Sequence, residues 1–163
     1  MLLSDAIKLF REHMIDINRS PETIKGYTIE LNLLCKYLYE KYNSPVYLEE
    51  ITFQDLEDYI RHLNRSGYAP VSRNRTVYII RSFYNYCCKK EYVLYNHGMK
   101  LEPISVTEKE RIFLTPKEMK ELISAINHRL IRLIVCTLYY TGMRISECLN
   151  LLTTDVNLSE QVI

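Results

Sequence analysis

Arg144 stands where its side chain could hold a phosphate group. It follows the apolar run 130–140, which predicts a buried helix, and Gly142, whose left-handed conformation would end that helix. The apolar residues of a second short helix share one face: Ile145, Leu149 and Leu152. At the amino terminus of that helix, free N–H groups favour an anion, and a guanidinium adds two donors for two phosphate oxygens. The segment predicts a phosphate-binding arginine, although Thr-Gly-x-Arg alone more often marks a helix end followed by a solvated arginine.

A second group of candidate residues is a stripe of positive charge between residues 61 and 90. This stretch contains no aspartate or glutamate, and its cations are Arg61, Arg65, Arg73, Arg75, Arg81, Lys89 and Lys90. The whole chain has a formal net charge of only +1, yet a local basic stripe can bind the phosphate backbone of DNA. On charge alone, a solvated basic face is an equally good interpretation.

The stripe contains a helix whose two faces differ in chemistry. At 100° per residue the core side is Val77, Ile80, Phe83, Tyr84 and Cys87, and the opposite side is Asn74, Tyr78, Arg81, Ser82, Asn85 and Lys89. Arginine and asparagine can read base edges in the major groove, whereas a serine at a helix amino terminus suits a phosphate. The candidate DNA contacts are therefore Ser72, Arg73, Asn74, Arg75, Tyr78 and Arg81, and base contact and phosphate contact both remain open.

Local start and stop signals predict the elements that position these residues. Four helices are expected first: from Ser4 or Asp5 to about Ile17, from Pro21 to before Pro45, from Phe53 to Arg65, and from Ser72 onward. Ser20 would cap the second helix, Thr52 with Asp55 resembles a capping box for the third, and Gly67 would end it.

The chain is expected to contain two domains. No helical period persists from His97 to about Leu114, and prolines and charges are frequent there, so this stretch is taken as a linker. Thr115-Pro116-Lys117-Glu118 then gives a cap, a proline and an acid, which predict a helix to about Ile126. The expected division is a four-helix domain at 1–96, a linker at 97–114 and a second domain from 115 to 163.

Composition excludes several classes of protein. With 47% hydrophobic and 25% charged residues the 163-residue chain is typical of a soluble globular protein, and it has neither a signal-peptide pattern nor a run long enough to span a bilayer. A cytoplasmic location is expected. The five cysteines and four histidines show no metal-ligand spacing, so no metal site is expected and the cysteines are taken as reduced.

The segment around Arg144 resembles the first active-site box of the tyrosine recombinases, the phage integrase family. The family form is T-G-hydrophobic-R-hydrophobic-S-E-L, and this chain has T-G-M-R-I-S-E-C, with Cys148 in place of the usual leucine. The resemblance continues upstream, in order, through 20–38, 48–63, 66–93 and 111–126. It implies a fold that is all-α in this chain: a four-helix SAM-like core-binding domain, followed by the first helices of an α+β tyrosine-recombinase catalytic domain.

The resemblance also implies a function, site-specific cleavage and rejoining of double-stranded DNA without metal or nucleotide cofactor. In this family a tyrosine attacks the scissile phosphate, giving a 3′-phosphotyrosine and a free 5′-hydroxyl. Arg144 would stabilise charge on the phosphate oxygens and Glu147 would help to orient it. The second helix would add DNA contacts at Thr23 and Lys25, whose ordinary interpretation is a solvated helix end.

The other catalytic parts of the family have no counterpart in this sequence. The chain is therefore expected to be the amino-terminal portion of a longer recombinase, inactive alone, with Tyr139 and Tyr140 serving as core residues. The family further implies a tetrameric assembly on DNA, and the carboxy-terminal half is expected to pack on a second copy or to be less stable. Two alternatives remain open. The chain could be a stand-alone helical DNA-binding module, such as a truncated regulator of a recombinase. It could instead be a helical module that binds an acidic protein.

Overall fold

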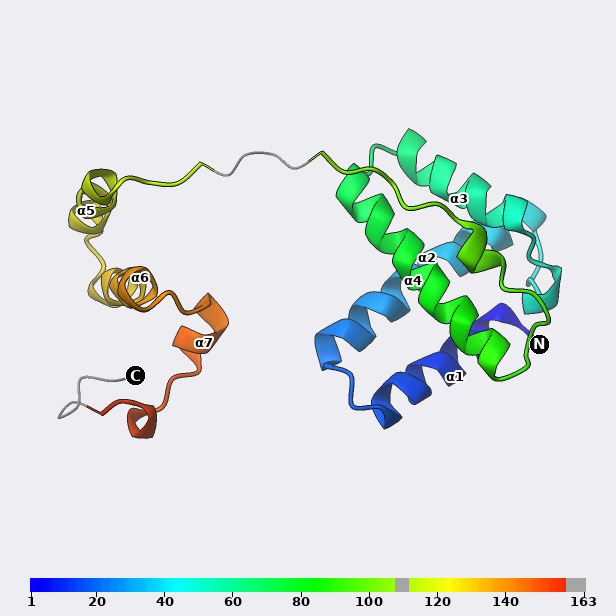
Figure 1. The fold of residues 1–163 in the computed structure, drawn as a ribbon, viewed down its shortest axis with the longest axis horizontal. Helices are drawn as coiled ribbons and strands as arrows, with labels where there is room; N and C mark the ends of the chain where they lie inside the picture. Colours follow the sequence, from blue (N-terminus) through cyan, green and yellow to red (C-terminus); the bar gives the residue numbers. More distant parts are fainter. Residues whose placement is uncertain (108–111, 158–163) are drawn as a thin grey trace. The chain divides into compact units, whose positions relative to one another are not determined.

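The computed structural model describes residues 1–107 and 112–157. The chain divides into two compact units, Met1–Glu108 and Lys109–Ile163, and each is described by itself. The described residues form helices and no named strand (Figure 1). The family resemblance also implies that the first strand of the catalytic domain begins near residues 161–163, and these lie outside the described residues. Among the described helices none has the length and apolar character needed to cross a bilayer.

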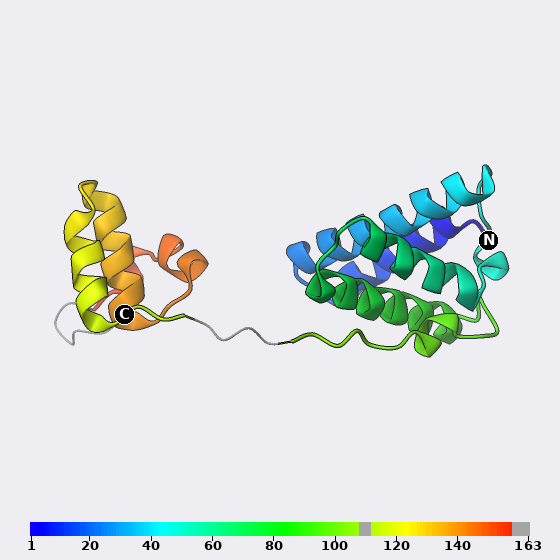
Figure 2. The same cartoon turned by 90° about the horizontal axis from the view of Figure 1, so that it is seen from above.

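The first unit contains four α-helices and two short 3-10 helices. They are α1 (Leu3–Asp16), α2 (Pro21–Tyr42), η1 (Leu48–Glu50), α3 (Phe53–Arg65), α4 (Pro70–Lys89) and η2 (His97–Lys100). Helix α1 pairs with α2 and α3 pairs with α4, while α4 also packs across α1 and α2 (Figures 1 and 2). Helix α4 is thus in contact with each of the other three α-helices.

Most helix boundaries in this unit follow the expected signals. The Ser20 side chain accepts the N–H of Thr23 at the start of α2, and Thr52 and Asp55 form the capping box of α3. Gly67, just after α3, has φ of 82°. These contacts are all local, which is why the sequence alone predicted them.

Two helix starts were predicted too late. Helix α1 begins at Leu3, before Ser4, and α4 begins at Pro70, so Ser72 is inside the first turn and does not open the helix. The residues that precede the two helices, Leu2 and Ala69, have no side-chain cap. A proline at the first position suffices at α4, because it needs no N–H partner and its φ is already helical.

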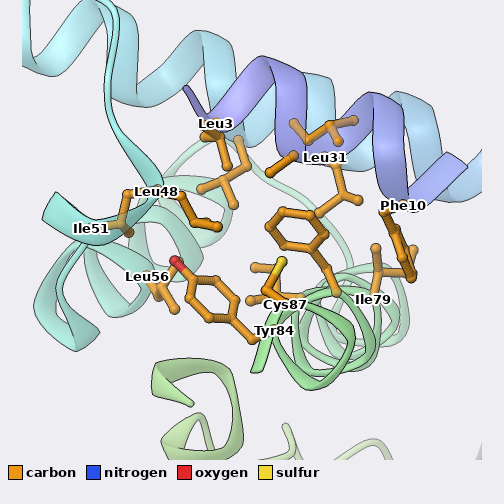
Figure 3. Packing of buried hydrophobic residues seen from close by; sticks show 14 of the residues in the cluster. Leu3, Phe10, Leu31, Leu48, Ile51, Leu56, Ile79, Tyr84 and Cys87 are labelled. Carbon is orange, nitrogen blue, oxygen red and sulfur yellow. The ribbon is translucent and has the colours of Figure 1, made fainter. Parts of the chain in front are cut away.

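The core of the first unit lies where the four helices meet. Figure 3 shows Phe10, Leu31 and Ile79 converging from α1, α2 and α4, and all three are buried. The five residues predicted for the inner face of α4 are buried as expected, from Val77 to Cys87. Tyr84 points its hydroxyl toward Leu48 and Leu56, and burial raises the pKa of that hydroxyl well above its usual range.

Asp55 joins α2 to α3 through a buried polar network. Its carboxylate accepts hydrogen bonds from Lys41 Nζ at 2.7 Å and from the Tyr42 hydroxyl, both at the end of α2. It also accepts from the N–H and hydroxyl of Thr52, at 2.9 and 2.7 Å. Burial alone would raise the pKa of Asp55, but these hydrogen bonds outweigh it and hold that pKa well below its usual range.

The first unit extends past the expected domain boundary. Residues 97–104, which were assigned to the linker, pack against α4: Leu101 is buried, and the N–H of Ile104 donates to Asn74 Oδ1 at 2.9 Å. The difference arises because η2 is only one turn long and is held by contacts with distant residues. Such contacts leave no helical period in the sequence.

The second unit contains α5 (Pro116–Ala125), α6 (Arg129–Thr141), α7 (Ile145–Leu149) and the 3-10 helix η3 (Thr153–Asp155). Thr115 caps α5 as expected and forms a capping box with Glu118, and Gly142 ends α6 with φ of 71°. The expectation that α6 is buried was wrong for the described residues: none of its side chains is buried, because only α5 and α7 pack against it. Leu152 lies beyond α7 and so is not on that helix.

Candidate functional site

Helix α4 presents a polar ridge along its outer side. The ridge residues are spaced three or four residues apart and therefore lie on one side of the helix. They are Ser72, Arg75, Tyr78, Ser82, Asn85 and Lys89. All of them are exposed or half-buried, and α4 carries no acidic residue. The ridge is therefore a row of hydrogen-bond donors and cations that faces outward.

The start of α2 borders this ridge. A side chain at Gly26 would collide with the guanidinium of Arg75, so Arg75 lies close over the backbone of α2. One turn earlier, Thr23 lines a hollow that is shared by α1, α2 and α4. We call the ridge together with Thr23, Gly26 and this hollow the α2–α4 surface.

The hollow combines basic and aromatic residues. It has a volume of about 380 Å³ and includes Arg19, Thr23, Tyr27, Ser82, Asn85, Lys89 and Lys90 in its lining, with no carboxylate. Within its lining His13 stacks on Tyr86, with ring centroids 4.8 Å apart. Cations and hydroxyl groups in one concave surface can bind phosphate oxygens, since each phosphate carries a full negative charge.

Three of the predicted contacts on α4 are engaged within the protein. The Nε of Arg73 donates to the carbonyl oxygen of Tyr68 at 3.2 Å. Asn74 accepts from Ile104, and Nη2 of Arg81 donates to the carbonyl oxygen of Met99 at 3.3 Å. These bonds use part of the donor and acceptor capacity that the sequence assigned to DNA.

The basic stripe is less uniform than its composition indicates. Arg61 forms ion pairs with Glu57 and Asp58 on α3, each at 3.0 Å, so its charge is compensated within that helix. Lys25 is exposed and lies apart from the hollow, against a shallow depression that includes Arg11 and Ile15. Of the second-helix candidates, the structure brings only Thr23 into the α2–α4 surface.

Sequence reasoning missed several members of this surface. Arg19 precedes the Ser20 cap and Tyr27 lies on the first turns of α2, so neither belonged to the stripe or to the predicted face of α4. Gly26 gave no signal either, because its role depends on Arg75, which is 49 residues away in the sequence. Only the packing of α2 against α4 brings these residues together.

Arg144 lies immediately before α7, as expected, and is bound to Glu147. Oε1 of Glu147 accepts from Nη1 of Arg144 at 2.9 Å, and Oε2 accepts the backbone N–H of Arg144 at 2.7 Å. These hydrogen bonds, the backbone one first, lower the pKa of Glu147. The Arg144 side chain is 83% exposed and so remains accessible to an anion.

The two tyrosines nearest Arg144 in sequence do not occupy a core. Tyr139 and Tyr140 are 42% and 74% exposed, and their rings meet edge to face at 5.0 Å. The expectation that they are core residues is therefore wrong for the described part of the chain. Their exposure has the same cause as that of the rest of α6, which few described elements cover.

Comparison with known protein families agrees with this arrangement. Residues 7–91 match the phage integrase N-terminal SAM-like domain and residues 112–163 match the phage integrase family. The chain belongs to the phage integrase family of tyrosine recombinases. Its first match, a SAM-like domain, covers α2, α3, α4 and most of α1, and its second covers the helices around Arg144.

Relatives and solved structures extend this assignment. The integrase-family chain is 28% identical over 147 residues to tyrosine recombinase XerC of Halalkalibacterium halodurans, with 87% of this chain and 48% of the relative covered. It is 30% identical over 159 residues to XerC of Caldanaerobacter subterraneus, with 85% and 45% covered. The chain thus spans about half the length of the curated relatives it matches.

A solved structure shows the same fold. A crystal structure of a lambda integrase dimer bound to a COC′ core site superposes with a TM-score of 0.78 at 15% identity, covering 96% of this chain and 43% of that chain. At this identity the likeness supports the fold, a SAM-like helical domain followed by the start of an integrase catalytic domain.

Proposed function

We propose that this chain binds double-stranded DNA through the α2–α4 surface. The observation that carries the proposal is the hollow, which combines three cations with serine, threonine and asparagine side chains and contains no carboxylate. DNA phosphates bind such groups, and a carboxylate would repel them. Membership of a DNA-recombining family supports the same conclusion.

The predicted contacts divide between the centre and the margin of this surface. We propose direct DNA contacts by Ser72, Arg75, Tyr78 and Thr23. Direct contacts are also proposed for Arg19 and Tyr27, the hollow residues that the sequence did not reveal. Arg73, at the margin, and Lys25, outside the α2–α4 surface, are proposed to contact phosphates only. Asn74 and Arg81 retain only some of their donors for DNA, because each already binds residues 99–104.

We also propose that the whole protein cleaves and rejoins DNA, with Arg144 stabilising the phosphate that is attacked. A planar, permanently charged guanidinium can bind two nonbridging oxygens at once, and such electrostatic stabilisation is a large catalytic term. Glu147 would hold the guanidinium in position without removing its exposure. Strand exchange needs two duplexes, so several copies of the protein would assemble on DNA. We propose that this assembly is a tetramer and that it acts in the cytoplasm.

Titration of labelled duplex DNA with the 163-residue polypeptide at increasing salt tests the DNA proposal. Binding should weaken steeply with salt, with a log–log slope of roughly −4 to −5 if about five phosphates are contacted. No binding at low salt would overturn the proposal. Absence of binding would favour the alternative in which the chain binds an acidic protein, since contacts with DNA phosphates are strongest at low salt.

A further inference from the structure

Residues 97–104 form a strap that runs back along α4 after the chain has left that helix (Figure 1). Its first turn, η2, packs against α4 beside Ile80 and Tyr84, and its last residue reaches Asn74, six to ten residues nearer the start of the helix. At 1.5 Å per residue, the strap moves the exit of the chain by about 9–15 Å along α4.

Three kinds of contact hold the strap. Gly98 lies so close to α4 that an added Cβ would be 2.9 Å from Cβ of Tyr84 and 3.1 Å from the carbonyl oxygen of Ile80. Leu101 is only 4% exposed. Asn74 and Arg81 then bind backbone atoms of the strap, the N–H of Ile104 and the carbonyl oxygen of Met99.

These two side-chain bonds are independent of strap sequence, because both partners on the strap are backbone atoms. They fix the path of the chain rather than any one side chain. The path ends at Asn74, which lies at the same end of α4 as Ser72 and Arg75 of the ridge. Without the strap, the connection to the second unit would begin near Lys90, at the opposite end of α4.

The strap also shortens the connection between the two units. With the strap in place, residues 105–114 join Ile104 to the Thr115 cap of α5, and a chain of ten residues spans at most about 33–36 Å. With the strap released, the connection would run from residue 97 and span at most roughly 60–65 Å. A shorter connection raises the effective concentration of the second unit near DNA held by the first.

We propose that Asn74 and Arg81 are positioning residues that anchor the connection beside the DNA-binding ridge and so set the reach of the second unit. This inference rests on the proposed function for its consequence on DNA, but the anchoring itself can be measured without DNA. Asn74 and Arg81 would then affect DNA binding mainly through the strap and little through base contacts.

Hydrogen exchange and small-angle X-ray scattering of the full chain test the anchoring. In Asn74→Leu, which lacks the acceptor, the amide of Ile104 should exchange about tenfold faster, and the maximum dimension in solution should increase. Asn74→Asp keeps an acceptor oxygen and should retain the wild-type values. Gly98→Ala, which would push the strap off α4 by collision, is a second variant with the same expected result.

Unchanged exchange at Ile104 in both Asn74→Leu and Gly98→Ala would overturn the proposal, as would faster exchange with no change in dimensions. DNA titration of Gly98→Ala, which changes no charge and no predicted DNA contact, tests the consequence, a several-fold loss of affinity. If no variant and no wild-type protein binds DNA, the proposed function fails while the exchange result still decides the anchoring.

Discussion

Glu147 holds Arg144 at two points, with one carboxylate oxygen on the guanidinium at 2.9 Å and the other on the backbone N–H at 2.7 Å. These bonds keep the pKa of Glu147 below its ordinary value. In Arg144→Ala the backbone bond can persist while the guanidinium is lost. The pKa of Glu147, followed by NMR of its carboxyl carbon, should therefore rise part of the way toward that of an unperturbed glutamate. A wild-type Glu147 with an ordinary pKa would contradict the pairing.

Asp55 is expected to be a major source of stability in the first unit. Asp55→Asn should lower the free energy of unfolding by about 2–3 kcal/mol, because it weakens a buried carboxylate network while leaving Lys41 in place. Asp58→Asn is the matched control: Asp58 also binds Lys41, at 3.0 Å, but it is more exposed, so this substitution should cost clearly less than Asp55→Asn. Equal losses in urea denaturation would show that burial of Asp55 adds nothing.

The same residue predicts a pH dependence. The folded-state pKa of Asp55 lies below the unfolded value. Its stabilisation is therefore complete above the unfolded pKa, about 4, and is lost as pH falls through the lower folded pKa. Wild-type protein should lose stability over that acidic range, and Asp55→Asn should lose less.

Sequence patterns predicted those parts of the fold that depend on neighbours within four residues. The caps at Ser20, Thr52 and Thr115 and the glycines that follow α3 and α6 are of this kind. In each case donor and acceptor are close in the chain, so residue type and spacing define the contact.

Features that depend on tertiary packing were missed. Asn74 and Ile104 are 30 residues apart, and Asp55 binds Lys41 across 14 residues, so no local pattern marks either bond. The hollow likewise needs α1, α2 and α4 in contact before Arg19 and Lys89 can line it. The place of Arg75 over the backbone of α2 also depends on packing, whereas Arg61 pairs with acids three and four residues away on its own helix, a local pattern that the count of cations overlooked.

The second unit is predicted to be less protected than the first. None of the residues in α5, α6 and α7 is buried, and Leu130 and Leu133 on α6 are 59% and 62% exposed. Exposed apolar surface of this kind should recruit a second copy or leave the helices marginal. Hydrogen exchange at several protein concentrations should show faster exchange in these helices than in α2 and α4, or protection that rises with concentration. Equal, concentration-independent protection in both units would contradict this prediction.

The 163-residue polypeptide is predicted to form no covalent bond to DNA. Arg144 can stabilise charge on an attacked phosphate but cannot itself attack, and no tyrosine of this sequence matches the nucleophile position of the family. A nicked suicide substrate that traps the 3′-phosphotyrosine intermediate is the test, analysed by denaturing electrophoresis. A stable adduct through Tyr139, Tyr140 or any other tyrosine would refute it.

The central claim, that the α2–α4 surface binds DNA, is tested most directly by comparing two variants that each lose three positive charges. One is Arg19→Ala with Arg75→Ala and Lys89→Ala, all on the α2–α4 surface. The other is Lys8→Ala with Lys36→Ala and Arg61→Ala, all exposed and ion-paired to acidic residues on their own helices.

Affinity for labelled duplex DNA is then measured against salt for both folded variants and the wild type. The surface variant should bind at least about tenfold more weakly and show a salt slope smaller by about 3, whereas the control should stay close to wild type. Equal weakening by the two variants would mean that total charge, and not this surface, governs binding, and would contradict the account.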